Sequence, residues 1–182
     1  MEIRQATAGD IGEVKKLMDS LVVTRETPGW RFATTGFFEY SKSEEALREL
    51  LNPYFAVAES NGSIRGFSVS YEDIFFNDHY AGSEDCGIKL IQHDFKTDFL
   101  YLSTLGVLNP DSPDSRGVAN DLVDWSIAQA RENGLKDIVT ITCEAPFKNH
   151  RMVGFLRKKE FEKFGRVFPG NEIELGAYEL AL

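Results

Sequence analysis

Residues 100–134, LYLSTLGVLNPDSPDSRGVANDLVDWSIAQARENG, decide the fold because they contain a strand, a turn and a helix in direct succession. The apolar run from Leu100 to Leu108 ends at Asn109-Pro110, which predicts a strand that stops there. Apolar side chains then recur at helical spacing up to Asn133-Gly134, where glycine favours a helix end. The turn between them ends in Arg116-Gly117-Val118-Ala119, and small residues ahead of a helix expose its first NH groups to an anion. The stretch therefore predicts either a diphosphate site or a tight strand-to-helix turn without a ligand.

Composition narrows the class of protein. The chain has 182 residues, enough for one domain with a sizeable core, and its 42% hydrophobic and 27% charged content is ordinary for a soluble globular protein. No stretch approaches the ~20 apolar residues of a membrane span, and the amino terminus lacks the pattern of a secretory signal. The net charge of −9 argues against nucleic acid as a partner and mildly favours a cationic substrate. Cys86 and Cys143 are too few for a disulfide framework, so a cytoplasmic location is expected.

The rest of the chain extends the pattern on both sides. Asn61-Gly62 predicts a tight hairpin, and Asp10 and Ser43 are placed to cap the helices that follow them. Strands are expected at 2–6, 54–60, 63–71, 100–108, 137–143, 161–167 and 174–182, and helices at 11–21, 43–52, 116–133 and 149–159. Residues 72–98 show little period; one interpretation extends two strands into a long hairpin. The order of elements predicts a mixed α/β layer fold in a single domain, residues 1–182.

Five segments in this order resemble the GNAT superfamily of acyl-CoA-dependent N-acetyltransferases. They are IRQATAGDIGEVKKLM (3–18), FAVAESNGSIRGFSVSY (55–71), LSTLGVLNP (102–110), SRGVANDLVDWSIAQARENG (115–134) and NHRMVGFLRKKEF (149–161). They are similar to the family's first strand and helix, its hairpin, its cofactor-binding strand, its pyrophosphate loop with the helix behind it, and its last helix. The resemblance implies a central, mostly antiparallel sheet of about seven strands flanked by about four helices.

The resemblance also implies acetyl-CoA as co-substrate, held mainly by backbone groups. The strand from Leu105 to Asn109 would pair with the pantetheine arm, and the NH of Val107 would polarise the thioester carbonyl. The NH groups of residues 115–120 would hold the pyrophosphate. The implied cofactor-binding residues are Leu105, Val107, Asn109, Arg116, Gly117, Val118, Ala119, Asn120 and Asn149.

The pyrophosphate loop departs from the family's pattern. Asp114 stands where the family usually has Gln or Arg, and Asp111 and Asp121 lie close to it in sequence. Carboxylates there would oppose a diphosphate unless they face the solvent, and Arg116 supplies one compensating charge. The sequence therefore predicts a weakened or altered cofactor loop.

The proton-transfer groups are less well defined. Leu156 stands at the position where the family often carries the Tyr that protonates the leaving thiolate. The resemblance assigns Tyr101 and Ser103 to the catalytic positions, where they would order a water that relays the amine's proton, since neither is a good base near neutral pH. Tyr101 or Tyr71 is the alternative acid. The alternative charged groups are Glu72, Asp73 and Glu144, and the histidines that could titrate usefully are His79, His93 and His150.

The acceptor side of the site is assigned to aromatic and acidic residues. Trp30 and Phe37 fall where the family walls the acceptor, although core packing or a dimer contact would account for them equally well. Tyr71 and Glu144 complete the predicted substrate-binding set. No metal site is expected, because the His and acidic residues near His79 match no ligand spacing.

The resulting prediction is an N-acetyltransferase in which an amine of a small molecule or protein attacks acetyl-CoA directly in a ternary complex. A catalytically silent acyl-CoA-binding or regulatory module is the main alternative, and a plain α/β interaction domain is a third. The expected partners are acetyl-CoA and an amine acceptor, with no nucleic acid and no membrane. A homodimer would bury the aromatic segments that lie outside the shared fold.

Overall fold

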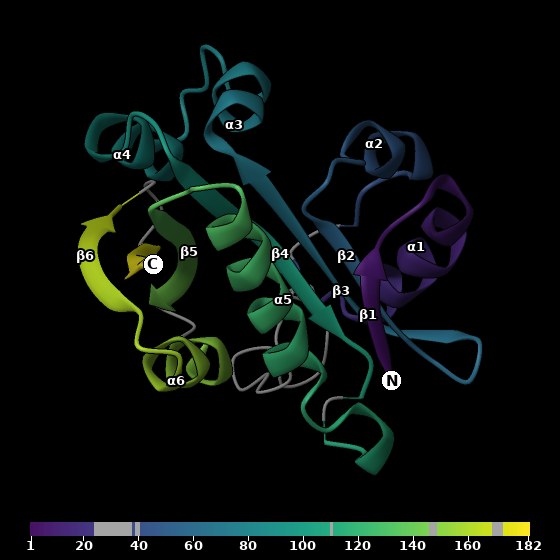
Figure 1. Cartoon of the computed structure of the whole chain (residues 1–182). Helices are drawn as coiled ribbons and strands as arrows, with labels where there is room; N and C mark the ends of the chain where they lie inside the picture. The colour runs from purple at the N-terminus through teal and green to yellow at the C-terminus, as the bar shows by residue number, and fades with distance from the viewer. Residues whose placement is uncertain (24–37, 39–40, 110, 146–148, 169–172) are drawn as a thin grey trace. The chain divides into compact units, whose positions relative to one another are not determined.

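The computed structural model describes residues 1–23, 38, 41–109, 111–145, 149–168 and 173–182, which form a seven-stranded sheet and six α-helices (Figure 1). The strands are β1 (Glu2–Gln5), β2 (Phe55–Ser60), β3 (Ser63–Glu72), β4 (Phe99–Val107), β5 (Asp137–Ala145), β6 (Glu162–Val167) and β7 (Glu174–Ala181). The helices are α1 (Ile11–Ser20), α2 (Glu44–Glu49), α3 (Asp73–His79), α4 (Cys86–Asp94), α5 (Val118–Glu132) and α6 (His150–Lys158). None of these helices is both long and apolar enough to cross a membrane.

The sheet is mostly antiparallel, and its strand order is β1-β2-β3-β4-β5-β7-β6. The β1–β2, β2–β3, β5–β7 and β6–β7 pairs are antiparallel, whereas β4 and β5 run parallel. The predicted mixed α/β fold with about seven strands is therefore confirmed, and the helices number six rather than about four in the described part of the chain.

The additional helices lie in residues 72–98, where the interpretation as a long hairpin is wrong. α3 follows β3 directly, and α4 begins after Asp85, whose carboxylate accepts a hydrogen bond from the backbone NH of Ile88. The segment's aromatic residues hide the helical period because α3 is only two turns long. Phe76, which is fully buried, holds α3 in place by packing edge-on against Phe99 and Tyr101.

Contacts between residues divide the chain into two compact units. Unit 1 comprises residues 1–70 and 104–129, and unit 2 comprises residues 71–103 and 130–182. The strands β3 and β4 and the helix α5 each contribute residues to both units.

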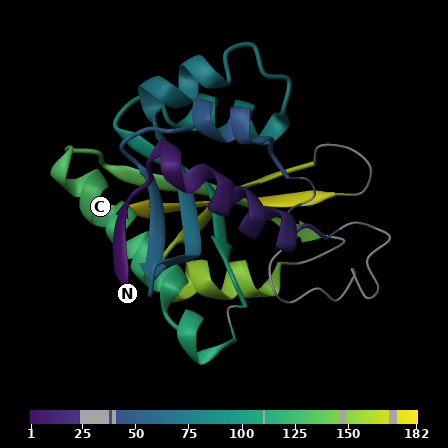
Figure 2. The same ribbon diagram turned by 90° about the vertical axis from the view of Figure 1, so that its right-hand side faces the viewer.

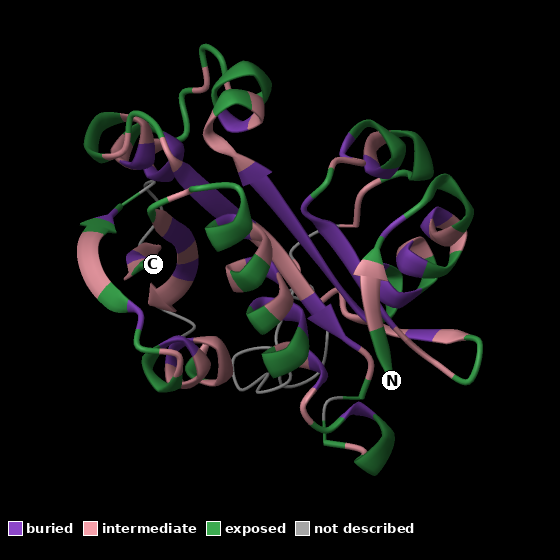
Figure 3. Cartoon of the chain, in the orientation of Figure 1, coloured by how far each residue is buried: buried purple, intermediate pink, exposed green. Residues whose placement is uncertain are grey.

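Unit 1 is built on β2 and β3, which are buried over most of their length (Figure 3). α1 buries Ile11, Val14, Leu17 and Met18, which lie at helical spacing along one face, and it packs against α2 (Figure 2). Ser43 caps α2 as predicted, because its hydroxyl accepts a hydrogen bond from the NH of Ala46. On the α5 side, Ala56 and Ala58 of β2 form one apolar cluster with Val107, Val118 and Leu122.

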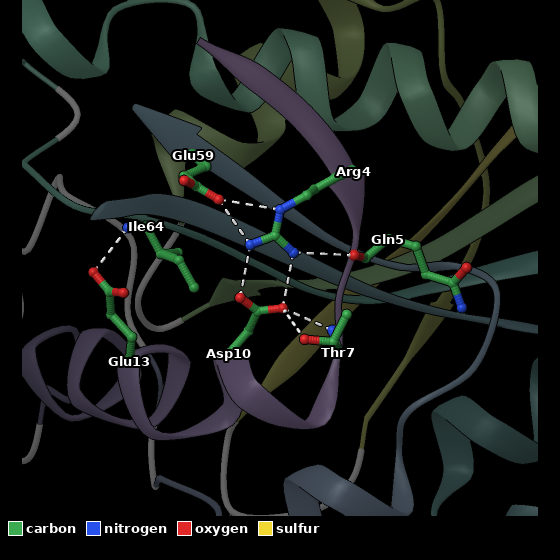
Figure 4. Close-up of polar contacts among 7 residues, drawn as sticks. All are labelled: Arg4, Gln5, Thr7, Asp10, Glu13, Glu59 and Ile64. Carbon is green, nitrogen blue, oxygen red and sulfur yellow. Dashed lines mark hydrogen bonds and ion pairs between the residues drawn. The ribbon is translucent and has the colours of Figure 1, made fainter. Parts of the chain in front are cut away.

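An ion-pair network joins the first strand of unit 1 to the turn that follows it (Figure 4). The Arg4 guanidinium binds both carboxylate oxygens of Asp10, at 2.8 and 2.7 Å, and it also binds Glu59 at 2.8 Å. Asp10 was predicted to cap α1, but its side chain makes no capping bond to that helix. Its carboxylate instead accepts hydrogen bonds from the backbone NH and the hydroxyl of Thr7, at 2.7 and 2.8 Å.

Unit 2 is built on the antiparallel ladder of β5, β7 and β6. α4 covers one face of this ladder, where a Cβ on Gly87 would lie 2.7 Å from Ile141 and a Cβ on Gly165 would lie 2.7 Å from Leu90. Glycine at these two positions therefore allows close approach between helix and sheet. α6 begins beside the end of β5, since the backbone NH of Asn149 donates to the carbonyl oxygen of Cys143 at 3.0 Å.

Candidate functional site

The end of β4 and the start of α5 share one apolar core in unit 1. Val107 is buried in the cluster that contains Val118 and Leu122, and Leu105 and Ala119 pack against it. Two of the predicted cofactor-binding residues, Leu105 and Ala119, therefore direct their side chains into packing. Both side chains are only partly buried, and the backbone role expected for these residues stays a prediction.

The loop between β4 and α5 is folded by its own hydrogen bonds. The buried hydroxyl of Ser115 donates to the carbonyl oxygen of Leu108 at 2.5 Å, and the NH of Ser112 donates to the carbonyl oxygen of Asn109 at 2.8 Å. The NH of Leu108 in turn donates to the carbonyl oxygen of Arg65 on β3, also at 2.8 Å. These hydrogen bonds connect the loop to the end of β4 and, through Leu108, to β3.

Gly117 provides the backbone conformation that opens α5. Its φ of +87° lies in the left-handed region, where a side chain is strained. The first helical turn follows directly, since the NH of Asp121 donates to the carbonyl oxygen of Gly117 at 3.0 Å. A Cβ on Gly117 would meet no atom closer than Asp121 Oδ2, at 4.0 Å. The space beside Gly117 is therefore open at the start of a 15-residue helix, where the helix dipole and the first NH groups favour an anion.

The acidic residues of the loop face the solvent. Asp111, Asp114 and Asp121 are all exposed, as is Arg116. Exposed carboxylates are screened by water and counter-ions, so they oppose a diphosphate far less than buried ones would. This placement favours the reading in which the loop can still bind an anion.

Tyr101 and Gly106 of β4 contact Tyr71 and Phe67 of β3, respectively. A Cβ on Gly106 would lie 2.5 Å from the ring of Phe67, and the ring of Tyr101 lies 6.2 Å from that of Tyr71. Phe67 and Tyr71 are four residues apart on one face of β3, whereas Tyr101 and Gly106 are five apart. The predicted catalytic residue Ser103 lies on β4 between Tyr101 and Gly106.

Tyr101 and Tyr71, two predicted site residues, lie together in an aromatic cluster of unit 2. Their side chains are almost fully buried, and Phe76 and Tyr80 pack around Tyr101 at ring distances of 5.0 and 6.2 Å. His79 lies 5.6 Å from Tyr71, between Phe75 and Tyr80. The cluster thus brings together Tyr71, His79 and Tyr101, which span 30 positions of the sequence.

β4 and β5 are joined by backbone pairing at one end and by a side chain further along. Residues 99–101 are in register with residues 137–139. At the next step the buried hydroxyl of Thr140 donates to the carbonyl oxygen of Leu102 at 2.8 Å. A side chain thus satisfies this carbonyl just before Ser103.

The other predicted residues fall as follows. Glu144 lies near the end of β5, where the hydroxyl of Tyr178 and the ammonium of Lys163 both donate to its carboxylate. The side-chain oxygen of Asn149 caps α6 by accepting from the NH of Met152 at 3.1 Å. Trp30 and Phe37 lie outside the described residues, as does most of the aromatic segment that suggested a homodimer.

Three residues that shape these sites were missed by the sequence analysis. Ser115 and Thr140 act through backbone carbonyls, which leave no side-chain pattern in a sequence. Tyr178 contacts Glu144 from 34 positions away. The available signal was the tyrosine itself within a strand, and it does not indicate the partner.

Solved structures of other proteins share this arrangement of strands and helices. A ribosomal-protein-alanine N-acetyltransferase from Brucella melitensis superposes with a TM-score of 0.67 at 17% identity, over 100% of both chains. A polyamine N-acetyltransferase from Drosophila melanogaster, which forms N-acetylagmatine, gives a TM-score of 0.64 at 13% identity, over 100% of this chain and 99% of that one. A GNAT superfamily phosphinothricin acetyltransferase from Sinorhizobium meliloti, in complex with acetyl-CoA, gives 0.65 at 12% identity, over 100% of this chain and 88% of that one.

The chain has the GNAT fold. At 10 to 17% identity among the similar structures, this is a likeness of fold and not of detailed sequence. No protein-family model matches the chain, and no curated protein matches it. Within a GNAT fold, the strand β4, its following loop and α5 are the elements that the sequence resemblance assigned to the cofactor.

Proposed function

We propose that this chain is a GNAT-family N-acetyltransferase that transfers an acetyl group from acetyl-CoA to a primary amine. The loop before α5 is the observation that carries the proposal. Gly117, at φ +87°, opens a 15-residue helix beside open space, and the loop ahead of it is tied to β4 through Ser115. This geometry suits a diphosphate, which is the part of CoA that such a loop would bind.

The residues along β4 suit the chemistry of acyl transfer. In the proposed reaction the amine nitrogen attacks the thioester carbonyl carbon, the N–C bond forms, and the C–S bond breaks. The nitrogen gives up a proton to a water held by Ser103 and Tyr101, and the departing thiolate gains one. The NH of Val107 polarises the carbonyl, a role that needs no particular side chain and is compatible with the burial of this residue.

The proposed acceptor is a cationic amine. Two of the similar structures are named for quite different acceptors, a ribosomal-protein alanine and a polyamine, so the fold alone does not choose between them. The net charge of −9 favours a free cationic small molecule over a basic-groove partner such as nucleic acid. Glu144, whose side chain is 12% exposed, is the proposed contact for the acceptor's ammonium.

A silent acyl-CoA-binding module is the second candidate, and one observation favours it. Leu156, at the place where the family often has its acidic Tyr, is fully buried. It therefore belongs to the core of unit 2, and its aliphatic side chain has no proton to donate. Turnover then depends on Tyr101 or on water, and a chain without an effective acid would bind acetyl-CoA without using it.

Calorimetry with acetyl-CoA, followed by a thiol-release assay with an amine panel, tests the proposal. The panel holds a polyamine, agmatine, free amino acids and a peptide with an amino-terminal alanine. Binding together with release of CoA thiol for any member supports acetyl transfer. Binding without turnover across the panel supports the silent module, and no binding overturns both.

A further inference from the structure

One face of β7 carries a polar cluster around Glu144, the proposed contact for the acceptor's ammonium. Glu174, Gly176 and Tyr178 alternate along the strand, so they share that face. The Tyr178 hydroxyl donates to Oε1 of Glu144, and the Lys163 ammonium donates to Oε2. We call Glu144, Lys163, Gly176 and Tyr178 the Glu144 cluster. Its carboxylate is held by two donors from two different strands.

Two β-bulges build the Glu144 cluster. In the β5–β7 ladder, Cys143 faces Leu175 and Ala145 faces Glu174, so Glu144 is the extra residue. In the β6–β7 ladder the register also shifts by one just beyond the Lys163–Tyr178 pair. A bulge redirects its side chain, and bulges are enriched beside functional sites. Next to these two irregularities, the Lys163 ammonium and the Tyr178 hydroxyl meet at the Glu144 carboxylate.

Gly176 supplies the room that the carboxylate occupies. A Cβ at this position would lie 2.6 Å from Oε1 of Glu144 and 2.9 Å from the ring of Tyr178. Glycine weakens a strand interior, so its presence at a buried position calls for a close neighbour, and here that neighbour is the carboxylate. The cluster is therefore a cradle shaped around an ionised group.

The surroundings of the cradle favour a protonated Tyr178. Burial and the Glu144 carboxylate both raise the pKa of Tyr178, so its hydroxyl stays a donor across the physiological range. Lys163 Nζ also lies 3.7 Å from Glu174, whose carboxylate is 3.4 Å from Arg166 Nε. Among the described residues, Arg157 on α6 and Arg166 on β6 also act on Tyr178, and both lower its pKa.

We propose that the Glu144 cluster is an ammonium-binding subsite in which Lys163 holds the place that the acceptor's ammonium takes. Lys163 has two carboxylates within reach, Glu144 and Glu174, so it can give up the first and keep the second. The Oε2 atom of Glu144 then accepts an N–H from the incoming cation, while Tyr178 keeps the carboxylate in position. The ligand class is a primary alkylammonium. That this ligand is the acetyl acceptor rests on the proposed acetyl transfer, whereas the binding of an alkylammonium at this subsite does not.

Replacing Lys163 tests the subsite without any acetyl-CoA. Lys163→Ala vacates the ammonium position and leaves a mostly buried carboxylate without its cation, so the melting temperature should fall by about 3 °C or more. Propylammonium chloride should then raise the melting temperature of this variant more than tetramethylammonium chloride at equal ionic strength, since the latter has no N–H to donate. Lys136→Ala is the matched control, because it removes an exposed lysine–carboxylate pair with Asp98 in the same unit. An equal response of Lys136→Ala, or no difference between the two salts, overturns the proposal.

Lys163→Gln covers the case in which Lys163→Ala does not fold. It keeps a neutral donor beside Glu144 and removes the competing charge, so the affinity of the protein for propylammonium should rise about threefold or more over wild type. Unchanged affinity overturns the subsite. In the acetyl-transfer assay the same variant should lower the KM for the amine and leave that for acetyl-CoA unchanged. If the variant binds propylammonium more tightly but the KM for the amine is unchanged, the subsite is supported and only its link to the acceptor is overturned.

Discussion

Ser115 donates its hydroxyl proton to the carbonyl oxygen of Leu108 across 2.5 Å, which joins the first residue of the loop between β4 and α5 to a residue near its end. The serine is 3% exposed, so no water can replace this bond without rearrangement. The bond sets where the next residues, Arg116 and Gly117, enter the helix. The loop is therefore held by a hydrogen bond that its sequence motif did not predict.

Ser115→Ala should weaken acetyl-CoA binding by about threefold to tenfold and leave kcat nearly unchanged, because it loosens the loop and touches no reacting atom. Ser112→Ala is the control, since the Ser112 side chain makes no capping bond in the same loop. Calorimetry on both variants checks this. Equal losses in the two would mean that the Ser115 bond does not position the site.

Gly117→Glu should abolish acetyl-CoA binding and leave the protein folded. The substitution strains a residue at φ +87° by about 1 kcal/mol or more and places a carboxylate at the start of α5, where it opposes a diphosphate. Gly134→Glu is a matched control, because Gly134 also has a positive φ, +73°, and open space around it, at the other end of the helix.

The two glycine variants should therefore lose similar stability in urea unfolding but differ in cofactor affinity. Undiminished acetyl-CoA binding by Gly117→Glu would rule out the assignment of this loop to the pyrophosphate.

Tyr101→Phe should lower turnover by about 100-fold and change acetyl-CoA affinity little if the hydroxyl takes part in proton transfer. The ring remains, so its packing against Phe76 at 5.0 Å is kept and stability should hold. Tyr80→Phe, in the same aromatic cluster, is the comparison. A rate equal to wild type would remove Tyr101 from the mechanism.

The sequence was sufficient for elements with a strong local signal. Ser43 caps α2, Asn61 and Gly62 turn the β2–β3 hairpin, and Gly117 opens α5, each because a single residue type suits a single backbone conformation. The strand and the loop before α5 were predicted from local signals, whereas their assignment to the cofactor came from the family resemblance and stays a prediction. Their fold was then confirmed.

The rest depended on contacts between distant residues. α3 and α4 are short helices whose aromatic residues serve the core of unit 2, so their spacing reads as irregular. The Glu144 cluster needs a bulge in each of two strands before its residues meet. A bulge shifts the alternation of a strand by one position, and nothing in the order of amino acids marks that shift.

The Arg4–Asp10 pair should make stability fall as the solution becomes acidic. The Arg4 guanidinium, with the hydrogen bonds from Thr7, holds the pKa of the Asp10 carboxyl well below its usual range. A carboxyl whose pKa is depressed by folding contributes stability above its unfolded pKa, near ~3.9, and loses it as the pH falls through that value towards the folded one. The contribution is roughly 2 kcal/mol at neutral pH, since the Asp10 side chain is only 12% exposed.

Asp10→Asn should remove that dependence. The free energy of unfolding in urea should fall between pH 7 and pH 3 in the wild type, and the fall should be smaller by roughly 1 kcal/mol in the variant, since pH 3 lies between the unfolded and the folded pKa of Asp10. Asp19→Asn is the control, because Asp19 pairs with Lys15 within α1 at a side-chain exposure of 49%, where an ion pair contributes little. If Asp19→Asn flattened the acid limb as much as Asp10→Asn, the acid sensitivity would belong to the general charge of the chain and not to the Arg4 network. A difference confined to Asp10→Asn would show that the network ties β1 to the turn before α1, and with it the edge of unit 1.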